Sequence, residues 1–387
     1  MDLILTNKRS INDILEHTKP AKLVTVRKYG SGGINKLIKG DNLQVMQTLL
    51  QDYGMSKKID LVYIDPPFST NSIFKHDEKR TSTVSPSNSD DVAYSDTLKG
   101  AEFLEFLRER LVFIRELMAE HGSIYLHIDY KVGHYVKIIM DEIFGRSNFR
   151  NDITRIKCNP KNFTRKGYGN IKDLVLFYSK TEDFVWNEPR QELTEEDIKR
   201  LFPKKNEKGR RYTTTPLHAP GETTNGRTGQ QWKGLMPPKG RHWRYDPSVL
   251  DELDSNGLIE WSQTGNPRKI IYADEAREKG KRMQDIWEFK DSPYPIYPTE
   301  KNVELLKTII RVSSNTGQMV FDCFCGSGTT LFAANQLKRN WIGIDNSHIA
   351  IKTAIKKLTP EKGLFNVGPE YEYIEQKVTA DVKVVSS

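Results

Sequence analysis

Residues 59–68 read IDLVYIDPPF, a mostly apolar run that stops at an aspartate and two prolines. Such a run predicts a buried strand, because proline fixes its own φ and cannot donate to a sheet ladder. The Asp65 side chain and the Pro66 carbonyl then project from the end of that strand. Ligands of open α/β sheets bind at this carboxyl edge. Taken alone, the Asp-Pro-Pro sequence is also compatible with a simple turn.

On both sides of this strand, helix patterns alternate with strand patterns. Apolar residues recur at helical spacing in several segments, and each such segment is followed by a short apolar run. The pairs of helix and strand are 103–119 with 123–129, 303–312 with 319–322, and 329–337 with 341–345. Gly122 is expected to end the first of these helices. The alternation predicts an α/β fold with a doubly wound, mostly parallel, Rossmann-like sheet.

The alternation breaks down between residues 181 and 288. Twelve Lys or Arg residues stand against two acidic residues between Lys199 and Arg244, whereas the net charge of the whole chain is +8. Positive charge is therefore concentrated in this segment, which favours a polyanionic partner such as nucleic acid. We predict three segments: 1–180, an irregular inserted domain at 181–288, and 289–387.

The composition excludes several classes of protein. The 387 residues are 37% hydrophobic and 28% charged, as in a globular rather than a disordered chain. There is no run of about 18 apolar residues and no apolar N-terminal signal, so neither a membrane span nor secretion is expected. The three cysteines, Cys158, Cys323 and Cys325, lack the spacing of a disulfide framework or a metal site. No metal is predicted, and a reducing cytoplasm is the expected setting.

Residues 322–330, DCFCGSGTT, follow one predicted strand and begin the next predicted helix. Glycines at such a turn let a ligand approach the backbone, and Asp345 ends the following strand, where it can bind a ribose. The third glycine of a dinucleotide fingerprint is missing, because Leu331 stands in its place. The nearby carboxylates favour a cationic nucleoside over a pyrophosphate. A tight turn without a ligand is the alternative.

Taken in order, these segments resemble the β-group of DNA amino-methyltransferases, the permuted class in which the catalytic motif precedes the cofactor motif. The matching segments are 37–43, 65–68, 106–144, 173–180, 297–306, 322–330 and 341–345. Mild departures from the family pattern are Phe68 for Tyr, Cys323 for Pro, Tyr297 for His and Asn302 for Pro. The resemblance implies a circularly permuted methyltransferase fold dependent on S-adenosylmethionine.

In that fold, residues 1–180 would form the catalytic half, 181–288 the target-recognition insert and 289–387 the cofactor-binding half. The implied activity is methyl transfer from S-adenosylmethionine to N6 of an adenine flipped out of double-stranded DNA. In the catalytic motif Asp65, Pro66, Pro67 and Phe68, the Asp65 carboxylate and the Pro66 carbonyl would hold the target amine, and Phe68 would stack on the base. The residues expected around the cofactor are Asp41, Thr299, Lys301, Asp322, Phe324, Gly326, Ser327, Gly328, Thr329 and Asp345.

The insert is expected to bind DNA. The expected contacts are Arg211, Lys239, Arg241, His242 and Arg244. Trp232 and Trp243 are expected in a small core instead. The polar segment 69–99 either closes over the flipped base or is disordered. A cognate restriction endonuclease and a second copy of the chain are further expected partners, in a bacterial or archaeal cell.

Three alternatives remain open from the sequence. The nearest is methylation of N4 of cytosine, which uses the same fold and cofactor. Family enzymes that act on cytosine more often carry Ser where Asp65 stands, so adenine is favoured. A DNA-binding protein without activity is the second alternative, and an NAD-dependent oxidoreductase is the third.

Overall fold

A computed structural model describes residues 8–67, 73–76, 91–95, 100–160, 166–292, 300–359 and 368–377. The chain divides into two compact units, one of residues 1–188 with 284–387 and one of residues 189–283. Phe68 and Thr299 lie outside the described residues, as does most of the segment 69–99. Within that segment, β4 (Ile73–His76) pairs antiparallel with β5 (Asp91–Ser95).

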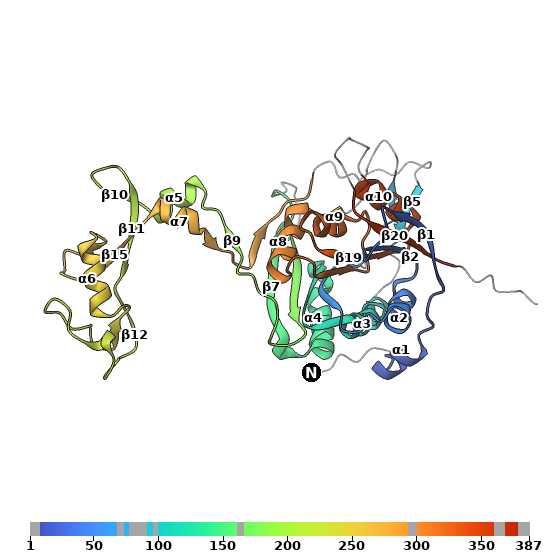
Figure 1. Cartoon of the computed structure of the whole chain (residues 1–387), viewed down its shortest axis with the longest axis horizontal. Coiled ribbons are helices and arrows are strands. Elements are labelled where there is room, and N and C mark those ends of the chain that lie inside the picture. Colours follow the sequence, from blue (N-terminus) through green and yellow to red (C-terminus); the bar gives the residue numbers. More distant parts are fainter. Residues whose placement is uncertain are drawn as a thin grey trace, which may run out of the picture. The chain divides into compact units, whose positions relative to one another are not determined.

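The larger unit is built on a ten-stranded sheet with the order β1-β20-β2-β19-β18-β3-β6-β8-β7-β17 (Figure 1). In that order the strands are Leu23–Tyr29, Tyr371–Gln376, Lys36–Lys39, Asn340–Asp345, Met319–Asp322, Ile59–Ile64, Met118–Ile128, Lys172–Ser179, Phe149–Ile156 and Ile286–Glu288. Neighbours from β20 to β6 run parallel, and β1, β8 and β7 add the antiparallel pairs. The prediction of a mostly parallel sheet is confirmed.

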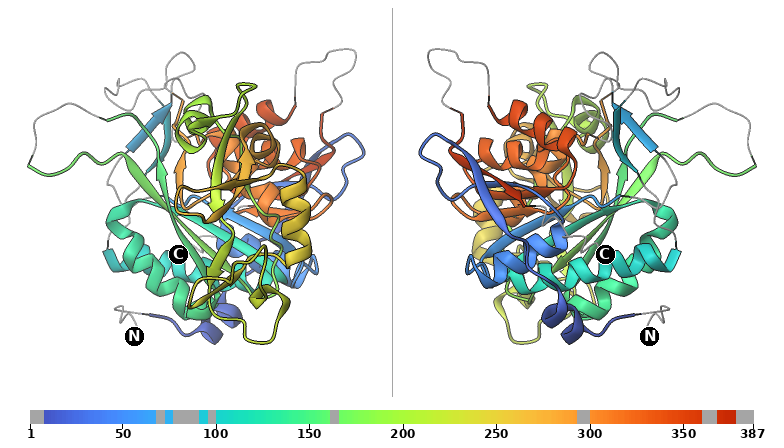
Figure 2. Two further views of the ribbon diagram at one scale, coloured as in Figure 1. Left: turned by 90° about the vertical axis from the view of Figure 1, so that its left-hand side faces the viewer. Right: turned by 90° about the vertical axis from the view of Figure 1, so that its right-hand side faces the viewer.

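Helices cover both faces of this sheet (Figures 1 and 2). One face carries α2 (Asn42–Gln51), α3 (Gly100–Leu117) and α4 (Tyr130–Phe144), with α1 (Ile11–His17) against α3. The other carries α8 (Val303–Ser313), α9 (Thr329–Gln336) and α10 (His348–Leu358). Asp41, Asn302 and Ser347 cap α2, α8 and α10, because their side chains accept hydrogen bonds from the first free N–H groups. None of the described helices is long and apolar enough to cross a membrane.

The expectation that Gly122 ends a helix is wrong. Helix α3 ends at Leu117, and Gly122 lies inside β6. A Cβ at this position would stand 2.9 Å from the carbonyl oxygen of Ala119 and 3.0 Å from that of Ile59, where the pairing of β3 with β6 shifts register. The glycine therefore allows two backbones to approach closely at an irregular point of the sheet.

The unit of residues 189–283 has a four-stranded antiparallel sheet, β10-β11-β15-β14, and a separate pair, β12 with β13. Its strands are β9 (Arg190–Gln191), β10 (Lys204–Lys205), β11 (Arg211–Pro216), β12 (His218–Pro220), β13 (Arg241–Trp243), β14 (Ile259–Trp261), β15 (Pro267–Tyr272) and β16 (Lys281–Arg282), and its helices are α5 (Glu195–Leu201), α6 (Pro247–Ser255) and α7 (Ala273–Lys279). Trp232 and Trp243 are buried with Leu217 and Leu250, which confirms their expected place in a small core.

Candidate active site

A cavity of about 410 Å³ lies where parallel strands of the large sheet end. Its walls include the residues that directly follow β2, β3, β18 and β19, namely Gly40 to Asn42, Asp65 to Pro67, Cys323 to Ser327 and Asn346 to Ser347, together with the terminal Asp322 and Asp345. Residues that follow parallel strands meet at one edge of a sheet. Four carboxylates from separate parts of the chain are therefore brought together: Asp41, Asp65, Asp322 and Asp345.

Most of the predicted site residues line this cavity. They are Asp41, Asp65, Pro66, Pro67, Lys301, Asp322, Phe324, Gly326, Ser327, Thr329 and Asp345. Gly328 is not part of the wall. Its φ is +75°, its N–H donates to the carbonyl of Cys325 at 2.8 Å, and a Cβ would lie 2.9 Å from that of Ala354. Gly328 thus forms the turn into α9 and packs closely on α10, and its expected role in the cofactor loop stays a prediction.

The carboxylate of Asp65 has one engaged and one free oxygen. Its Oδ2 lies 2.6 Å from Nζ of Lys301, so the structure pairs Lys301 with the catalytic motif. Its Oδ1 is buried and has no hydrogen-bond partner among the described residues. A buried acceptor without a donor costs roughly 1–3 kcal/mol. Such an atom is suited to accept a hydrogen bond from a ligand.

Two further carboxylates of the cavity, the buried Asp322 and the partly buried Asp345, accept hydrogen bonds from residues of the glycine loop (322–330) or next to Asp345. Asp322 accepts a hydrogen bond from the N–H of Phe324 at 3.0 Å, and Asp345 accepts from Gly326 and Ser347 at 2.8 Å each. Burial raises the pKa of Asp322 to about 7, and the charges of Asp65 and Asp345 add to the effect. Burial also raises the pKa of Asp345. A cation in the cavity would stabilise both carboxylates.

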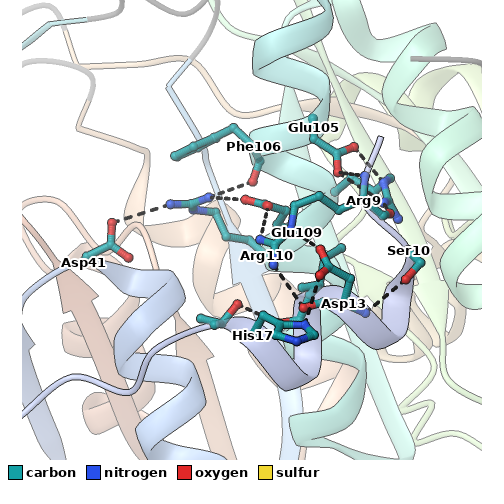
Figure 3. A network of polar contacts seen from close by, with 12 residues as sticks. Arg9, Ser10, Asp13, His17, Asp41, Glu105, Phe106, Glu109 and Arg110 are labelled. Carbon is teal, nitrogen blue, oxygen red and sulfur yellow. Dashed lines mark hydrogen bonds and ion pairs between the residues drawn. The ribbon is translucent and has the colours of Figure 1, made fainter. Parts of the chain in front are cut away.

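Arg110 also lines the cavity, although its only feature in the sequence is its place on a predicted amphipathic helix. Its Nε donates to Oδ1 of Asn42 at 2.7 Å, and Nη2 lies 3.7 Å from Oδ2 of Asp41 (Figure 3). Its guanidinium stacks on the ring of Phe106, 3.4 Å from the centroid. Burial lowers the pKa of Arg110, and the charge of Asp41 opposes this. A buried guanidinium on the wall suits a carboxylate ligand.

A lysine from α10 donates hydrogen bonds to two hydroxyl groups of the glycine loop. Nζ of Lys357 donates to Oγ1 of Thr329 at 2.7 Å and to Oγ of Ser327 at 3.1 Å, and it pairs with Glu300. Burial lowers the pKa of this lysine, whereas Glu300 raises it. Lys357 therefore fixes the loop through its two hydroxyl groups. A lysine in the last turn of a helix is usually exposed to solvent, so its sequence position does not indicate this role.

The predicted DNA contacts lie within the unit of residues 189–283. Lys239 and Arg241 are exposed, and Arg241 donates to Nδ1 of His218 at 3.1 Å. His242 contacts the carbonyl of Gly221, and Arg244 donates to that of Pro216 at 3.1 Å. Arg211, on β11, donates to the carbonyl of Phe202 at 3.3 Å. The β12–β13 pair and the residues next to it thus present most of this group.

The residues of the cavity fit S-adenosylmethionine. Its volume falls in the range of ligand pockets, about 300–1,000 Å³. The carboxylates of the buried Asp322 and the partly buried Asp345 match a ligand that carries a sulfonium, an ammonium and a ribose, and Arg110 matches its carboxylate. In the described part of the chain, no group of three or more His, Cys, Asp or Glu residues is placed to hold a metal ion.

Comparison with known proteins agrees with this geometry. The sequence profile of the DNA methylase family matches residues 59–356. The type II methyltransferase M.EcaI of Enterobacter cloacae is 42% identical over 329 residues, which cover 84% of this chain and 69% of that protein. The Mod subunit of the type III restriction-modification enzyme StyLTI of Salmonella typhimurium is 26% identical over 341 residues, 78% of this chain. The chain spans 50% of that subunit's length.

Among solved structures, that of the M1.HpyAVI-SAM complex matches with a TM-score of 0.45 at 17% identity, over 84% of this chain and 100% of that chain. The family profile covers most of the sequence, and M.EcaI is similar along most of its own length. The chain therefore belongs to the DNA methylase family, as a DNA methyltransferase of the restriction-modification type whose methyl donor is S-adenosylmethionine.

Proposed function

We propose that this DNA methyltransferase methylates N6 of an adenine flipped out of double-stranded DNA. The observation that carries the proposal is the buried Oδ1 of Asp65, which has no partner among the described residues and lies beside the Pro66 carbonyl at the cavity. An exocyclic amine has two hydrogens to donate. A carboxylate oxygen and a neighbouring carbonyl are a matched pair of acceptors for them.

These two acceptors address the chemical difficulty of the reaction. The amine of a base is a weak nucleophile, because its lone pair is delocalised into the ring. Hydrogen bonds from its two N–H groups to Asp65 and Pro66 favour a pyramidal nitrogen and stabilise the positive charge that develops on attack. Pro67 fixes the direction of the loop, and Phe68, which lies outside the described residues, is proposed from the family resemblance to stack on the extruded base.

When bound, S-adenosylmethionine supplies the methyl group. We assign its ribose to Asp345, its cationic amino-acid end to Asp322 and its carboxylate to Arg110, since these groups of the wall have the opposite charge or the matching hydrogen-bonding capacity. Phe324 and Gly326 form the adjoining loop. Asp41 caps α2 with Oδ1, which leaves Oδ2 directed toward Arg110.

The unit of residues 189–283 is the proposed target-recognition domain. Its concentration of Lys and Arg, including Lys239, Arg241 and Arg244, would neutralise phosphates and make DNA affinity depend on salt. A restriction endonuclease is a proposed partner, in line with the restriction-modification name of a relative, and a second copy of the chain is proposed from the family resemblance alone.

Methylation of N4 of cytosine is the second candidate, because the family profile covers both kinds of amine. Its amine could donate to the same two acceptors. The aspartate at position 65 supports adenine, since family enzymes that act on cytosine more often carry Ser there.

The experiment is methyl transfer to duplex DNA by the wild-type chain and by Asp65→Ala, with the product digested to nucleosides. We expect wild type to form N6-methyladenine and Asp65→Ala to lose transfer by at least about 100-fold, the usual cost of removing a transition-state acceptor. Cofactor affinity measured by calorimetry should change little. The exposed carboxylate of β7 offers a matched control, Asp152→Ala, which should retain activity. Normal transfer by Asp65→Ala would refute the mechanism, and N4-methylcytosine would favour the second candidate.

A further inference from the structure

Three buried polar side chains, Tyr63, His127 and Asp173, are linked by hydrogen bonds in a network next to the active site. The hydroxyl of Tyr63 on β3 lies 3.0 Å from Nδ1 of His127 on β6, and Nε2 of His127 lies 3.2 Å from Oδ2 of Asp173 on β8. Their relative exposures are 2%, 0% and 3%. Burying three polar groups in the middle of a sheet is costly unless all are paired, so the network is a built feature of the site.

The register of the sheet places this network next to the catalytic motif. Tyr63 pairs with Tyr125 in the parallel ladder of β3 and β6, and His127 is two residues further along β6. Asp65 follows two residues after Tyr63, so both side chains leave the strand on the same side. Helix α8 covers this side, where Ser313 bonds the hydroxyl of Tyr125 at 2.8 Å. Tyr63 itself lines the cavity together with Asp65.

The charges behind His127 decide the direction of these hydrogen bonds. Burial raises the pKa of Asp173, but the hydrogen bonds from His127 and Lys157 outweigh burial and leave the pKa lowered. Nζ of Lys157 lies 2.6 Å from Asp173, and Nη1 of Arg155 lies 3.7 Å away. Asp173 is therefore an anion that can only accept a hydrogen bond. Burial lowers the pKa of His127, so the imidazole is neutral at neutral pH.

With Asp173 as acceptor, Nε2 of His127 carries the hydrogen and Nδ1 is the basic nitrogen. The hydroxyl of Tyr63 then donates its hydrogen to Nδ1. Within the described residues, no donor is recorded for the Tyr63 oxygen, and Tyr63 is one of the residues that line the cavity. The imidazole is itself hydrogen-bonded to a carboxylate, so the tyrosine hydroxyl that donates to it gains negative charge on oxygen. That oxygen can then accept a proton from a ligand in the cavity.

We propose that Tyr63, with His127 and Asp173 behind it, takes up the proton that the target amine loses during methylation. The proposal rests on the proposed function but holds for either base, because both amines lose one proton. The nitrogen forms its bond to the methyl carbon with its lone pair, and in the same step an N–H bond breaks and returns its electron pair to nitrogen. That proton forms a new O–H bond on Tyr63, while the original tyrosine hydrogen moves to Nδ1 of His127.

The product of this step is a neutral tyrosine and an imidazolium next to the Asp173 anion. The groups that act on His127 come from several elements. Asp65 and Asp173 stabilise its positive charge, and Lys301 opposes it. Arg155 and Lys157 act on Asp173 from β7 and from the residue that follows β7. The relay leaves Asp65 free to remain an acceptor, which matches its pairing with Lys301.

The principal test is the single-turnover methylation rate of Tyr63→Phe, at saturating S-adenosylmethionine and duplex DNA. This variant removes one oxygen from a buried site and keeps the ring. We expect a loss of about 100-fold, the low end of the effect of general acid–base catalysis, with unchanged affinity for the cofactor. The matched control is Tyr125→Phe, another buried tyrosine on the same side of the sheet, whose hydroxyl contacts Ser313 instead. Because Tyr125 takes no part in the proton transfer, the single-turnover rate of this control should stay within about threefold of the wild-type rate.

A second variant separates proton uptake from hydrogen bonding. His127→Asn keeps an oxygen that can accept from Tyr63 but cannot be protonated, so we expect its rate to fall with that of Tyr63→Phe. In wild type the rate should depend quadratically on the deuterium fraction of the solvent, because two protons move, and this curvature should vanish in both variants.

Equal losses in Tyr63→Phe and Tyr125→Phe, or a His127→Asn variant close to wild type, would overturn the relay. The wild-type rate in the same assay reports separately on the proposed function. An inactive wild type would refute the methyl transfer itself, whereas an active wild type with unaffected variants would refute only the relay.

Discussion

Protonation of Asp322 should control the affinity for S-adenosylmethionine near neutral pH. Asp322 is fully enclosed beside the glycine loop, and burial raises its pKa to about 7. The ionised form attracts the cationic end of the cofactor, and the neutral form does not. The affinity for S-adenosylmethionine should therefore be highest above pH 7 and should fall as the pH drops through 7.

The size of the effect follows from the ionised fraction. With a pKa of about 7, roughly nine-tenths of Asp322 is ionised at pH 8 and roughly one-tenth at pH 6. The dissociation constant should rise by about tenfold over this interval, which corresponds to about 1.4 kcal/mol. Binding below pH 7 should also release close to one proton per cofactor, because the bound cation favours the carboxylate.

Isothermal titration calorimetry from pH 5.5 to 8.5, in buffers of different ionisation enthalpy, measures both quantities. The control is Asp322→Asn, which keeps an acceptor for the N–H of Phe324 but cannot ionise. An α-amino group titrates near pH 8, and this contribution of the ligand is common to both proteins. The wild-type affinity relative to Asp322→Asn should thus fall tenfold from pH 8 to pH 6. A constant ratio across this range would refute the assignment of Asp322.

Two further perturbations test the loop and the insert. Gly328→Ala should destabilise the protein by at least about 1–2 kcal/mol, because alanine disfavours a φ of +75° and its Cβ would stand 2.9 Å from Ala354; urea denaturation measures this, and an unchanged midpoint would contradict it. Lys239→Ala should reduce the slope of log affinity for DNA against log salt by about one, as fluorescence anisotropy can measure, whereas an unchanged slope would remove Lys239 from the phosphate contacts.

The parts of the site that sequence could predict are those attached to strand ends. Asp65, Asp322 and Asp345 each follow or end an apolar run, and parallel strands bring such residues to one edge whatever the details of packing. The cavity indeed contains all three. The same argument explains why a mostly parallel sheet could be predicted, whereas the edge strand β1 and its neighbour β20, which carry two charged residues each, could not.

Other parts depend on packing that no local pattern encodes. Arg110 belongs to an ordinary amphipathic helix, and only the packing of α3 against α2 brings it to Asn42 and the cavity wall. Tyr63, His127 and Asp173 each lie in an apolar strand, and their contact needs the register of three strands. The strands of the 189–283 unit are short and polar, so their alternation is too weak to detect.

Single-molecule sequencing of genomic DNA from a methylation-free host that expresses this chain tests the central claim most directly, because it gives the modified base and its sequence context together. We predict N6-methyladenine at one recurrent sequence, present with the wild-type chain and absent with Asp65→Ala. Modification of cytosine at N4, or adenine methylation that persists in Asp65→Ala, would contradict the account.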